Sequence, residues 1–175
     1  MAEATFGKET DGASSSASST DKKDASTATP STSGTLTKLT ARIWLSSAGT
    51  ALAKGVLYSD SGGVPDALLA TGDEVSLTAT SEGAVDLPFS GAEQYELVGG
   101  TAYWIGWIHN DPGTMSFTWS RAATAAANQQ IADTYSDGPS DPYGTATGLS
   151  GPIDCYGTYT ESGGAEDEGK FFTFF

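Results

Sequence analysis

The chain of 175 residues carries 22 acidic and 8 basic side chains, for a net charge of −14, yet only 17% of its residues are charged. A polyanion is repelled by phosphate groups, so we expect binding neither to nucleic acid nor to a membrane surface. No run of about 18 apolar residues predicts a membrane span, and one cysteine, Cys155, excludes an internal disulfide. Polarity supplied by Ser, Thr and Gly is typical of β-sheets with hydroxylated outer faces.

The N-terminal part of the chain contains little that could be buried. Residues 12–34 are nearly all Ser, Thr, Ala, Asp and Lys. Composition alone therefore predicts a disordered arm for this segment.

Alternation of apolar and polar residues with a period of two begins at Leu36 and continues through the middle of the chain. Turn residues separate the alternating runs. The predicted strands are residues 36–45, 53–58, 74–78, 84–87, 101–109, 115–119 and 153–159. In the first of these, Trp44 is expected on the face opposite to the aliphatic side chains.

Residues 101–109 are apolar almost throughout. This pattern predicts a strand that is buried on both faces or that lies at an interface. Trp104 and Trp107 are three residues apart, so we expect them to point to opposite faces. The Ala-rich residues 121–130 have no apolar stripe and are predicted to form a loop or a single turn.

Seven or eight short strands without βαβ alternation predict an all-β fold, an antiparallel β-sandwich of jelly-roll or Ig-like kind. We expect one domain over residues 5–160 with a short C-terminal tail, which consists of an acidic flexible linker at 161–169 and an aromatic segment at 170–175. Four phenylalanines of this segment would each contribute about 2 kcal/mol if buried. The predicted partner-docking residues are Phe171, Phe172, Phe174 and Phe175.

The residue pattern gives little support to catalysis, and we predict that the protein is not an enzyme. His109 is the only histidine and stands at the end of a predicted strand beside a turn, a position more typical of a structural role. Cys155 lies inside a strand pattern. Neither a phosphate-binding loop nor a known hydrolase motif is present.

Two kinds of ligand remain candidates. Carboxylates stand among Gly and Ser in two loops, where oxygen ligands on irregular backbone could hold Ca²⁺, although Asp in such loops more often caps turns. The candidate ligands are Asp60, Asp66, Asp133, Asp137 and Asp141. No other cofactor is expected. The exposed ring of Trp44 is the candidate contact for a glycan, against the alternative that the aromatic residues form the core.

Three separated motifs resemble a diffuse family of β-sandwich domains. Residues 56–71 read VLYSDSGGVPDALLAT, residues 97–106 read LVGGTAYWIG and residues 133–144 read DTYSDGPSDPYG. They are similar to the family segments LYSDxxGxPGALLAT, TTYWLG and TYASGPSNPFG, although Asp66 replaces the family's glycine. The closing residues 156–160 also fit its last strand.

Domains of this family occur in prokaryotic surface and secreted proteins and in structural proteins of tailed viruses. The resemblance implies a sandwich domain without shared catalytic residues. It also implies that residues 5–33, in contrast to the prediction from composition, form a first strand and a Ser/Thr-rich strand pair.

These observations lead to a functional hypothesis. A chain that begins with Met and shows no signal or anchor is expected to be a virion structural protein of a tailed virus, at the virion surface as a head decoration or a tail or fibre accessory. Its partners would be other copies, with a trimer as the expected oligomer, and other virion proteins. The strong acidity suits a haloarchaeal virus, because carboxylates keep a surface hydrated at high salt. The alternative is a carbohydrate-binding or adhesin module that is extracellular or on a cell surface.

Overall fold

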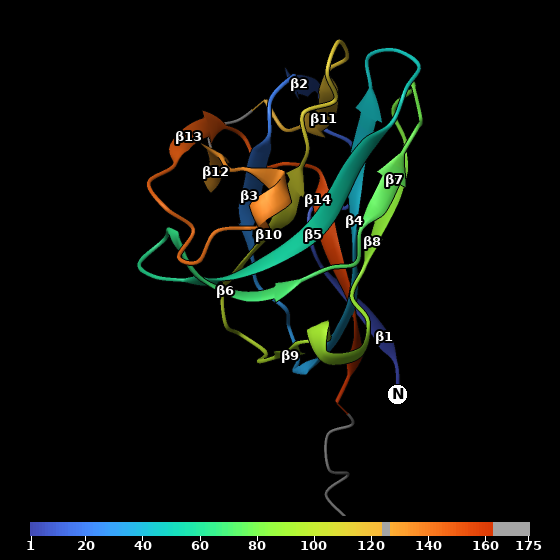
Figure 1. The fold of residues 1–175 in the computed structure, drawn as a ribbon. Helices are drawn as coiled ribbons and strands as arrows, with labels where there is room; N and C mark the ends of the chain where they lie inside the picture. Colours follow the sequence, from blue (N-terminus) through green and yellow to red (C-terminus); the bar gives the residue numbers. More distant parts are fainter. Residues whose placement is uncertain (124–126, 163–175) are drawn as a thin grey trace, which may run out of the picture.

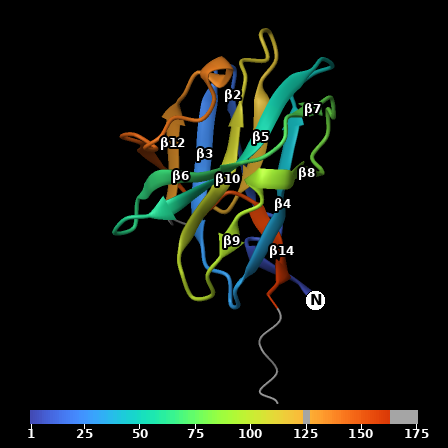
Figure 2. The same cartoon turned by 60° about the horizontal axis from the view of Figure 1, so that its bottom comes forward.

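The computed structural model describes residues 1–123 and 127–162, which form two antiparallel sheets packed face to face (Figures 1 and 2). Sheet one follows the order β1 (Glu3–Gly7), β14 (Cys155–Glu161), β4 (Gly34–Leu45), β11 (Phe117–Arg121) and β2 (Ser14–Ser18), with β8 (Ala84–Pro88) and β9 (Glu96–Leu97) also paired with β4. Sheet two follows β13 (Thr147–Ser150), β12 (Ala127–Ala132), β3 (Lys22–Ala28), β10 (Tyr103–His109), β5 (Ala51–Asp60) and β6 (Pro65–Thr71), with β7 (Val75–Leu77) also paired with β5. The predicted antiparallel β-sandwich is confirmed.

The main core lies between the inner faces of the two sheets. In β4 the side chains of Leu39, Ile43 and Leu45 are fully buried there, as the alternation predicts. Sheet two contributes Ile105 and Trp107 from β10. Each such side chain stabilises the fold by about 2 kcal/mol relative to exposure, so this layer holds the sheets together.

A second apolar cluster covers the outer face of sheet two. Trp104 is fully buried there, with Tyr58 from β5 and with Tyr135 and Tyr143 from the connection between β12 and β13. All seven residues of β10 are therefore buried. The prediction that Trp104 and Trp107 point to opposite faces is confirmed, and the outer face of β10 is covered by this chain's own connection.

The N-terminal segment is ordered, so the prediction of a disordered arm from composition is wrong. β3 lies in the interior of sheet two and pairs with β10 on one side and β12 on the other. The close approach of β3 to β10 requires a glycine, because a Cβ on Gly106 would lie 1.9 Å from the carbonyl oxygen of Asp24. Hydrogen bonds to two neighbouring strands thus order a segment that is poor in large apolar side chains.

Residues 121–130 also differ from the prediction of a loop or single turn. Arg121 ends β11, and residues 127–130 belong to β12, which pairs with both β3 and β13. Pairing with these two strands stabilises β12, although its Ala-rich sequence has no apolar stripe. At the C-terminal end, β14 extends to Glu161, the first residue of the predicted linker; residues 163–175, including the rest of that linker and the aromatic segment, lie outside the described part of the chain.

The helical content of the described residues is confined to two short 3-10 turns, η1 (Gly91–Glu93) and η2 (Tyr135–Asp137). None of the helices in this part of the chain is long and apolar enough to cross a membrane. The N-terminus lies next to the end of β14, where the amide of Glu161 donates to the carbonyl oxygen of Ala2 over 2.9 Å (Figure 1).

Candidate functional site

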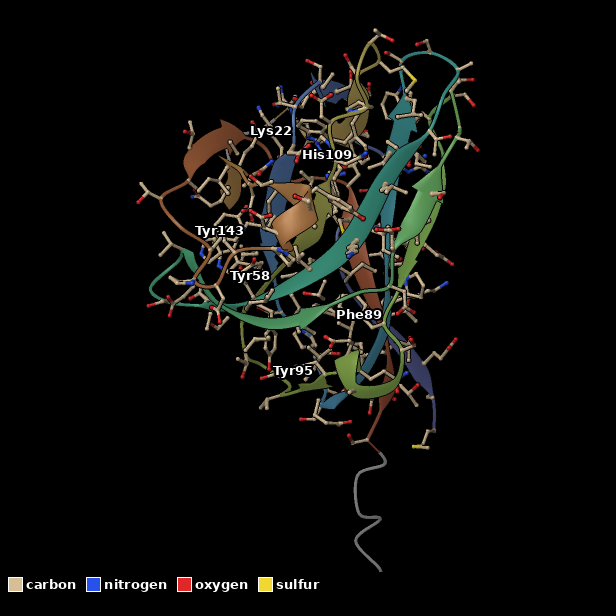
Figure 3. All side chains as sticks on the ribbon, viewed as in Figure 1. Lys22, Tyr58, Phe89, Tyr95, His109 and Tyr143 are labelled. Carbon is tan, nitrogen blue, oxygen red and sulfur yellow. The ribbon has the colours of Figure 1, made fainter. Side chains whose placement is uncertain are left out.

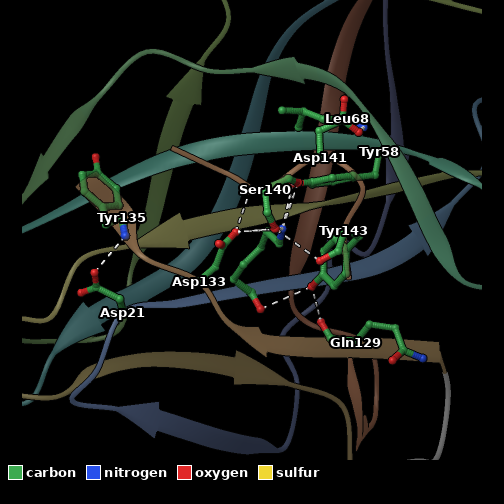
Figure 4. Close-up of polar contacts among 10 residues, drawn as sticks. Asp21, Tyr58, Leu68, Gln129, Asp133, Tyr135, Ser140, Asp141 and Tyr143 are labelled. Carbon is green, nitrogen blue, oxygen red and sulfur yellow. Dashed lines mark hydrogen bonds and ion pairs between the residues drawn. The ribbon is translucent and has the colours of Figure 1, made fainter. Parts of the chain in front are cut away.

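The most concentrated polar chemistry of the described chain surrounds Lys23 on β3. Lys23 is fully buried, because its side chain points to the outer face of sheet two beneath the connection between β12 and β13. Its Nζ lies 2.9 Å from Oδ2 of Asp133 and donates to Oγ of Ser140 over 2.8 Å. It also contacts the hydroxyl of Tyr58 at 2.9 Å. We call these residues, together with Tyr143, the Lys23 cluster (Figure 4).

Two residues of the connection between β12 and β13 contact Lys23. Asp133 follows β12 directly, and Ser140 follows the turn η2. The amide of Ser140 donates to Oδ2 of Asp133 over 2.9 Å, and its hydroxyl lies 3.1 Å from the same oxygen. A single carboxylate oxygen therefore contacts the backbone and side chain of Ser140 as well as Lys23.

Two tyrosine rings enclose the ammonium group. Its Nζ lies 4.8 Å from the ring centroid of Tyr58 and 4.3 Å from that of Tyr143, within the range of cation–π attraction. The rings meet edge to face with centroids 4.9 Å apart, and Figure 3 shows them side by side. Tyr143 also donates to the carbonyl oxygen of Gln129 over 2.8 Å, which ties the connection to β12.

Burial decides the protonation behaviour of the cluster. Loss of hydration lowers the pKa of Lys23, while its hydrogen bond to Asp133 and the charges of Asp133 and Asp141 act in the opposite direction. Burial, together with the same two carboxylates, raises the pKa of Tyr58. The pKa of Tyr143 is raised chiefly by burial as well. At neutral pH the two tyrosines are thus neutral, and Lys23 loses its proton more readily than a lysine in water.

The five aspartates predicted as calcium ligands have different surroundings. Asp133 belongs to the Lys23 cluster, while Oδ1 of Asp141 accepts from the amide of Leu68 over 3.0 Å. Asp60 accepts from Nε1 of Trp104 over 2.8 Å. Asp66 and Asp137 are exposed, on β6 and in η2.

The two predicted loops do meet, because the amide of Tyr143 donates to the carbonyl oxygen of Asp66 over 2.8 Å. Within residues 1–123 and 127–162, however, the structure gathers no group of three His, Cys, Asp or Glu side chains suited to a metal ion. The carboxylates of Asp60, Asp133 and Asp141 instead fix loops through hydrogen bonds. Calcium binding stays a prediction.

His109 and Cys155 both lie in the core. The His109 ring stacks on Phe117 with centroids 4.0 Å apart, and burial lowers its pKa to about 4. Burial raises the pKa of the Cys155 thiol. A neutral, stacked imidazole and a protonated thiol suit packing, as the sequence pattern predicts for both residues.

Trp44 lies on the outer face of sheet one, where it is partly exposed. Thr118 of β11 is its neighbour across the strand pair, and Ala17 of β2 is the next residue in the row. Partly exposed side chains continue this face along β4 and β14. They are Thr35, Lys38, Arg42, Tyr156 and Thr160. The hydroxylated outer face expected from the composition is thus present in sheet one.

A pocket of about 570 Å³ opens between the end of β1 and β3. Ile105, Ile153 and Cys155 provide its apolar lining, and Lys8 and Glu9 belong to its polar lining. The pocket is separate from the Lys23 cluster, which lies on the other face of β3.

Lys23 is the residue of the candidate site that sequence reasoning missed, because it stands in the segment that composition predicts to be disordered. The only signal was a pair of adjacent lysines in a chain with 8 basic residues. The residues predicted to dock on a partner lie outside the described part of the chain. They are Phe171, Phe172, Phe174 and Phe175.

Comparisons of the chain with protein-family models, with curated proteins and with solved structures gave no match. The motif resemblance described above therefore remains a resemblance, and function has to be argued from the chain's own geometry.

Proposed function

We propose that this protein is a non-enzymatic structural protein of a tailed-virus particle, a head decoration or a tail or fibre accessory. It would act by association with other copies and with other virion proteins. The observation that carries the proposal is the fixation of the connection between β12 and β13 by the ion pair of the buried Lys23 with the largely buried Asp133. The polar groups best suited to chemistry thus hold a loop rigid, and rigidity suits a building block more than a turnover site.

The outer face of sheet one offers a surface for such association. It carries hydroxyl groups and the ring of Trp44 on a regular sheet rather than on mobile loops. The basic residues of this face are paired, Lys38 with Asp86 and Arg42 with Asp11, so it can be buried against a neighbour without leaving these charges unpaired. A homotrimer is our proposed assembly, and the virion surface our proposed location.

The net charge of −14 bears on the source of such a particle. Self-repulsion between copies is strong at low salt and is screened within about 3 Å at 1 M salt. We therefore propose that copies associate best at high salt, as in a virus of a haloarchaeal host. Native mass spectrometry in volatile salt at low and high concentration tests this directly. A monomer at both concentrations would contradict self-association.

Location is tested by labelling. Antibodies raised against the purified chain should decorate intact particles from a culture of the organism that encodes it, as seen by immunogold electron microscopy. Preimmune serum is the control. Label confined to cells, with particles present but bare, would contradict the virion assignment.

The aromatic C-terminal segment remains our proposed docking peptide. Deletion of residues 170–175 should reduce incorporation into particles severalfold, because about 2 kcal/mol per docked phenylalanine would be lost. Replacement of Glu166, Asp167 and Glu168 by serine is the matched control, since it alters the adjoining acidic residues and leaves the aromatic ones. Normal occupancy of the truncated protein would refute the docking role.

The partly exposed ring of Trp44 favours one alternative function, a carbohydrate-binding or adhesin module. A partly exposed aromatic ring, with Thr118 opposite it on the neighbouring strand, is the type of surface on which a sugar stacks. A glycan array tests it: specific binding that is lost in Trp44→Ala and retained in part in Trp44→Phe would support the alternative over a purely structural role.

A further inference from the structure

The Lys23 cluster holds a fully buried amine in contact with a carboxyl group that is only 13% exposed. Nζ of Lys23 lies 2.9 Å from Oδ2 of Asp133, and the lysine is fully buried. A second close pair, Lys8 and Asp154, has a similar separation of 2.6 Å, but the Lys8 side chain is 20% exposed. Only the first pair combines contact with complete burial of the lysine.

We propose that Lys23 and Asp133 condense to form an intramolecular isopeptide bond that joins β3 to the connection after β12. The bond would be an amide between Nζ of Lys23 and Cγ of Asp133. This inference does not depend on the proposed function.

Burial favours the reactive, uncharged form of the lysine. An ion pair removed from water loses its hydration, whereas the uncharged amine and carboxylic acid lose much less. Lys23 therefore gives up a proton more easily in the cluster than in solution, and Asp133 is the carboxylate in contact that receives it. The burial that lowers the pKa of Lys23 acts in this direction. The neutral amine is the nucleophile, as in other lysine-dependent covalent chemistry.

Ser140 is placed to move the second proton. Its Oγ accepts from Nζ of Lys23 over 2.8 Å and lies 3.1 Å from Oδ2 of Asp133, so it touches both reacting groups. As the Nζ–Cγ bond forms, one proton passes from Nζ to Oγ while the hydroxyl proton of Ser140 passes to Oδ2. The Cγ–Oδ2 bond then breaks.

The atoms balance without any oxidant or co-reactant. The ammonium group carries three protons; one stays on the amide nitrogen and two leave with Oδ2 as water. Contact within a fixed cluster replaces an encounter in solution, and effective molarities of about 10⁵–10⁸ M are reached in well-oriented intramolecular reactions. This proximity offsets the cost of amide formation in water, and the two tyrosine rings shield the product from hydrolysis.

The intact mass of the denatured wild-type protein tests the proposal. The mass should lie about 18 Da below the value calculated from the sequence, after allowance for removal of Met1, because one water is lost. Proteolysis and tandem mass spectrometry should then find a branched peptide that joins Lys23 to Asp133. An intact mass equal to the calculated value after prolonged incubation of the folded protein would overturn the proposal.

Loss of water from another site has the same mass and must be separated from the cross-link. Asp-Gly sequences lose water to form succinimides, and the chain contains Asp11-Gly12 and Asp137-Gly138. Hydroxylamine opens a succinimide and leaves an amide intact. A loss of 18 Da that hydroxylamine abolishes, or that maps to residues other than 23 and 133, would also overturn the proposal.

Three variants sharpen the test. Lys23→Arg should restore the full calculated mass, because a guanidinium does not form this amide. Lys22→Arg is the matched control on the same strand and should retain the loss, since the amine of Lys22 donates to Gln130 instead. Ser140→Ala should show a lower cross-linked fraction than wild type at each time after induction of expression. An unchanged time course would overturn the relay through Ser140.

Discussion

The outer faces of both sheets are formed by antiparallel strands, but they differ in how much of the chain packs over them. On sheet two, the connection between β12 and β13 lies over Trp104 and is held by Lys23 and Asp133, whose side chains are 0% and 13% exposed. On sheet one, the ion pair of Lys38 and Asp86 is closer, at 2.7 Å, yet its side chains are 38% and 54% exposed. The comparison shows that burial, more than the distance between the charges, determines how much an ion pair contributes to stability. The pair of Lys23 and Asp133 fixes a loop, whereas that of Lys38 and Asp86 lies on a solvated surface.

The largest expected effect is a difference in stability loss when each of these two ion pairs is broken. Asp133→Ala leaves the Lys23 amine buried without its partner and also removes the proposed cross-link, so the free energy of unfolding should fall by at least about 3–5 kcal/mol. Asp86→Ala, the matched change on sheet one, should cost less than about 1 kcal/mol. Urea denaturation of both variants measures this. The part of the Asp86→Ala effect that comes from Lys38 should vanish at 1 M NaCl, leaving the hydrogen bond from Thr40, while the effect of Asp133→Ala persists. Equal losses would remove the distinction between the faces.

The next effect concerns Asp24, the neighbour of Lys23 on the opposite face of β3. Burial raises its pKa to about 7, against weaker opposing effects of a hydrogen bond from Gln130 and the charge of Lys22. Because this folded pKa lies above the value of about 4 in an unfolded chain, stability is lost as pH rises from about 4 to about 7.

Asp24→Asn removes that titration. The variant should therefore be more stable than wild type at pH 8, by about 4 kcal/mol, and equal to it near pH 4. Urea midpoints at the two pH values measure the difference, and groups that titrate in both proteins cancel. A stabilisation that is the same at both pH values would show that Asp24 does not carry the pH dependence.

A smaller effect is expected from the hydroxyl of Tyr143 in the cover of sheet two. Tyr143→Phe keeps the ring beside Lys23 but removes the donor to the carbonyl oxygen of Gln129. The free energy of unfolding should fall by about 1 kcal/mol. Hydrogen exchange should show faster opening of the connection than of β10. Loosening of both at the same rate would mean that the cover and the sheet open together.

The smallest effect is expected on the uncovered face. Trp44→Ala should change the free energy of unfolding by less than about 1 kcal/mol, because the ring is partly exposed and lies outside both apolar clusters. Thermal denaturation with Trp104→Ala as comparison measures the contrast, since loss of that buried ring should cost about 3–5 kcal/mol. A large loss in Trp44→Ala would assign the ring to packing.

Alternation predicted the central strands well. Residues 36–45 and 101–109 lie within or nearly within β4 and β10, because apolar side chains of period two must face a core. β3 could not be predicted from composition, since its stability comes from hydrogen bonds with β10 and β12. The resemblance of the three motifs did imply strands in this segment, and β1, β2 and β3 agree with it.

The sequence indicated only one part of the candidate site, the Asp-rich loop. The Asp-rich segment 133–141 stood out as a calcium loop, whereas in the structure two of its carboxylates fix the loop by hydrogen bonds. What the sequence could not supply was the partner, because Lys23 lies far from Asp133 in the chain and only the pairing of β3 with β12 brings them together.

The sequence by itself determined the sandwich, its strong negative charge and the opposite orientations of Trp104 and Trp107, because periodicity and composition are local properties of a chain. Tertiary structure alone decided that β10 is covered on its outer face and that a lysine from a Ser/Thr-rich segment contacts an aspartate of a loop. These are properties of strand pairing between distant segments, and the free energy of burying a charge depends on what those segments place around it.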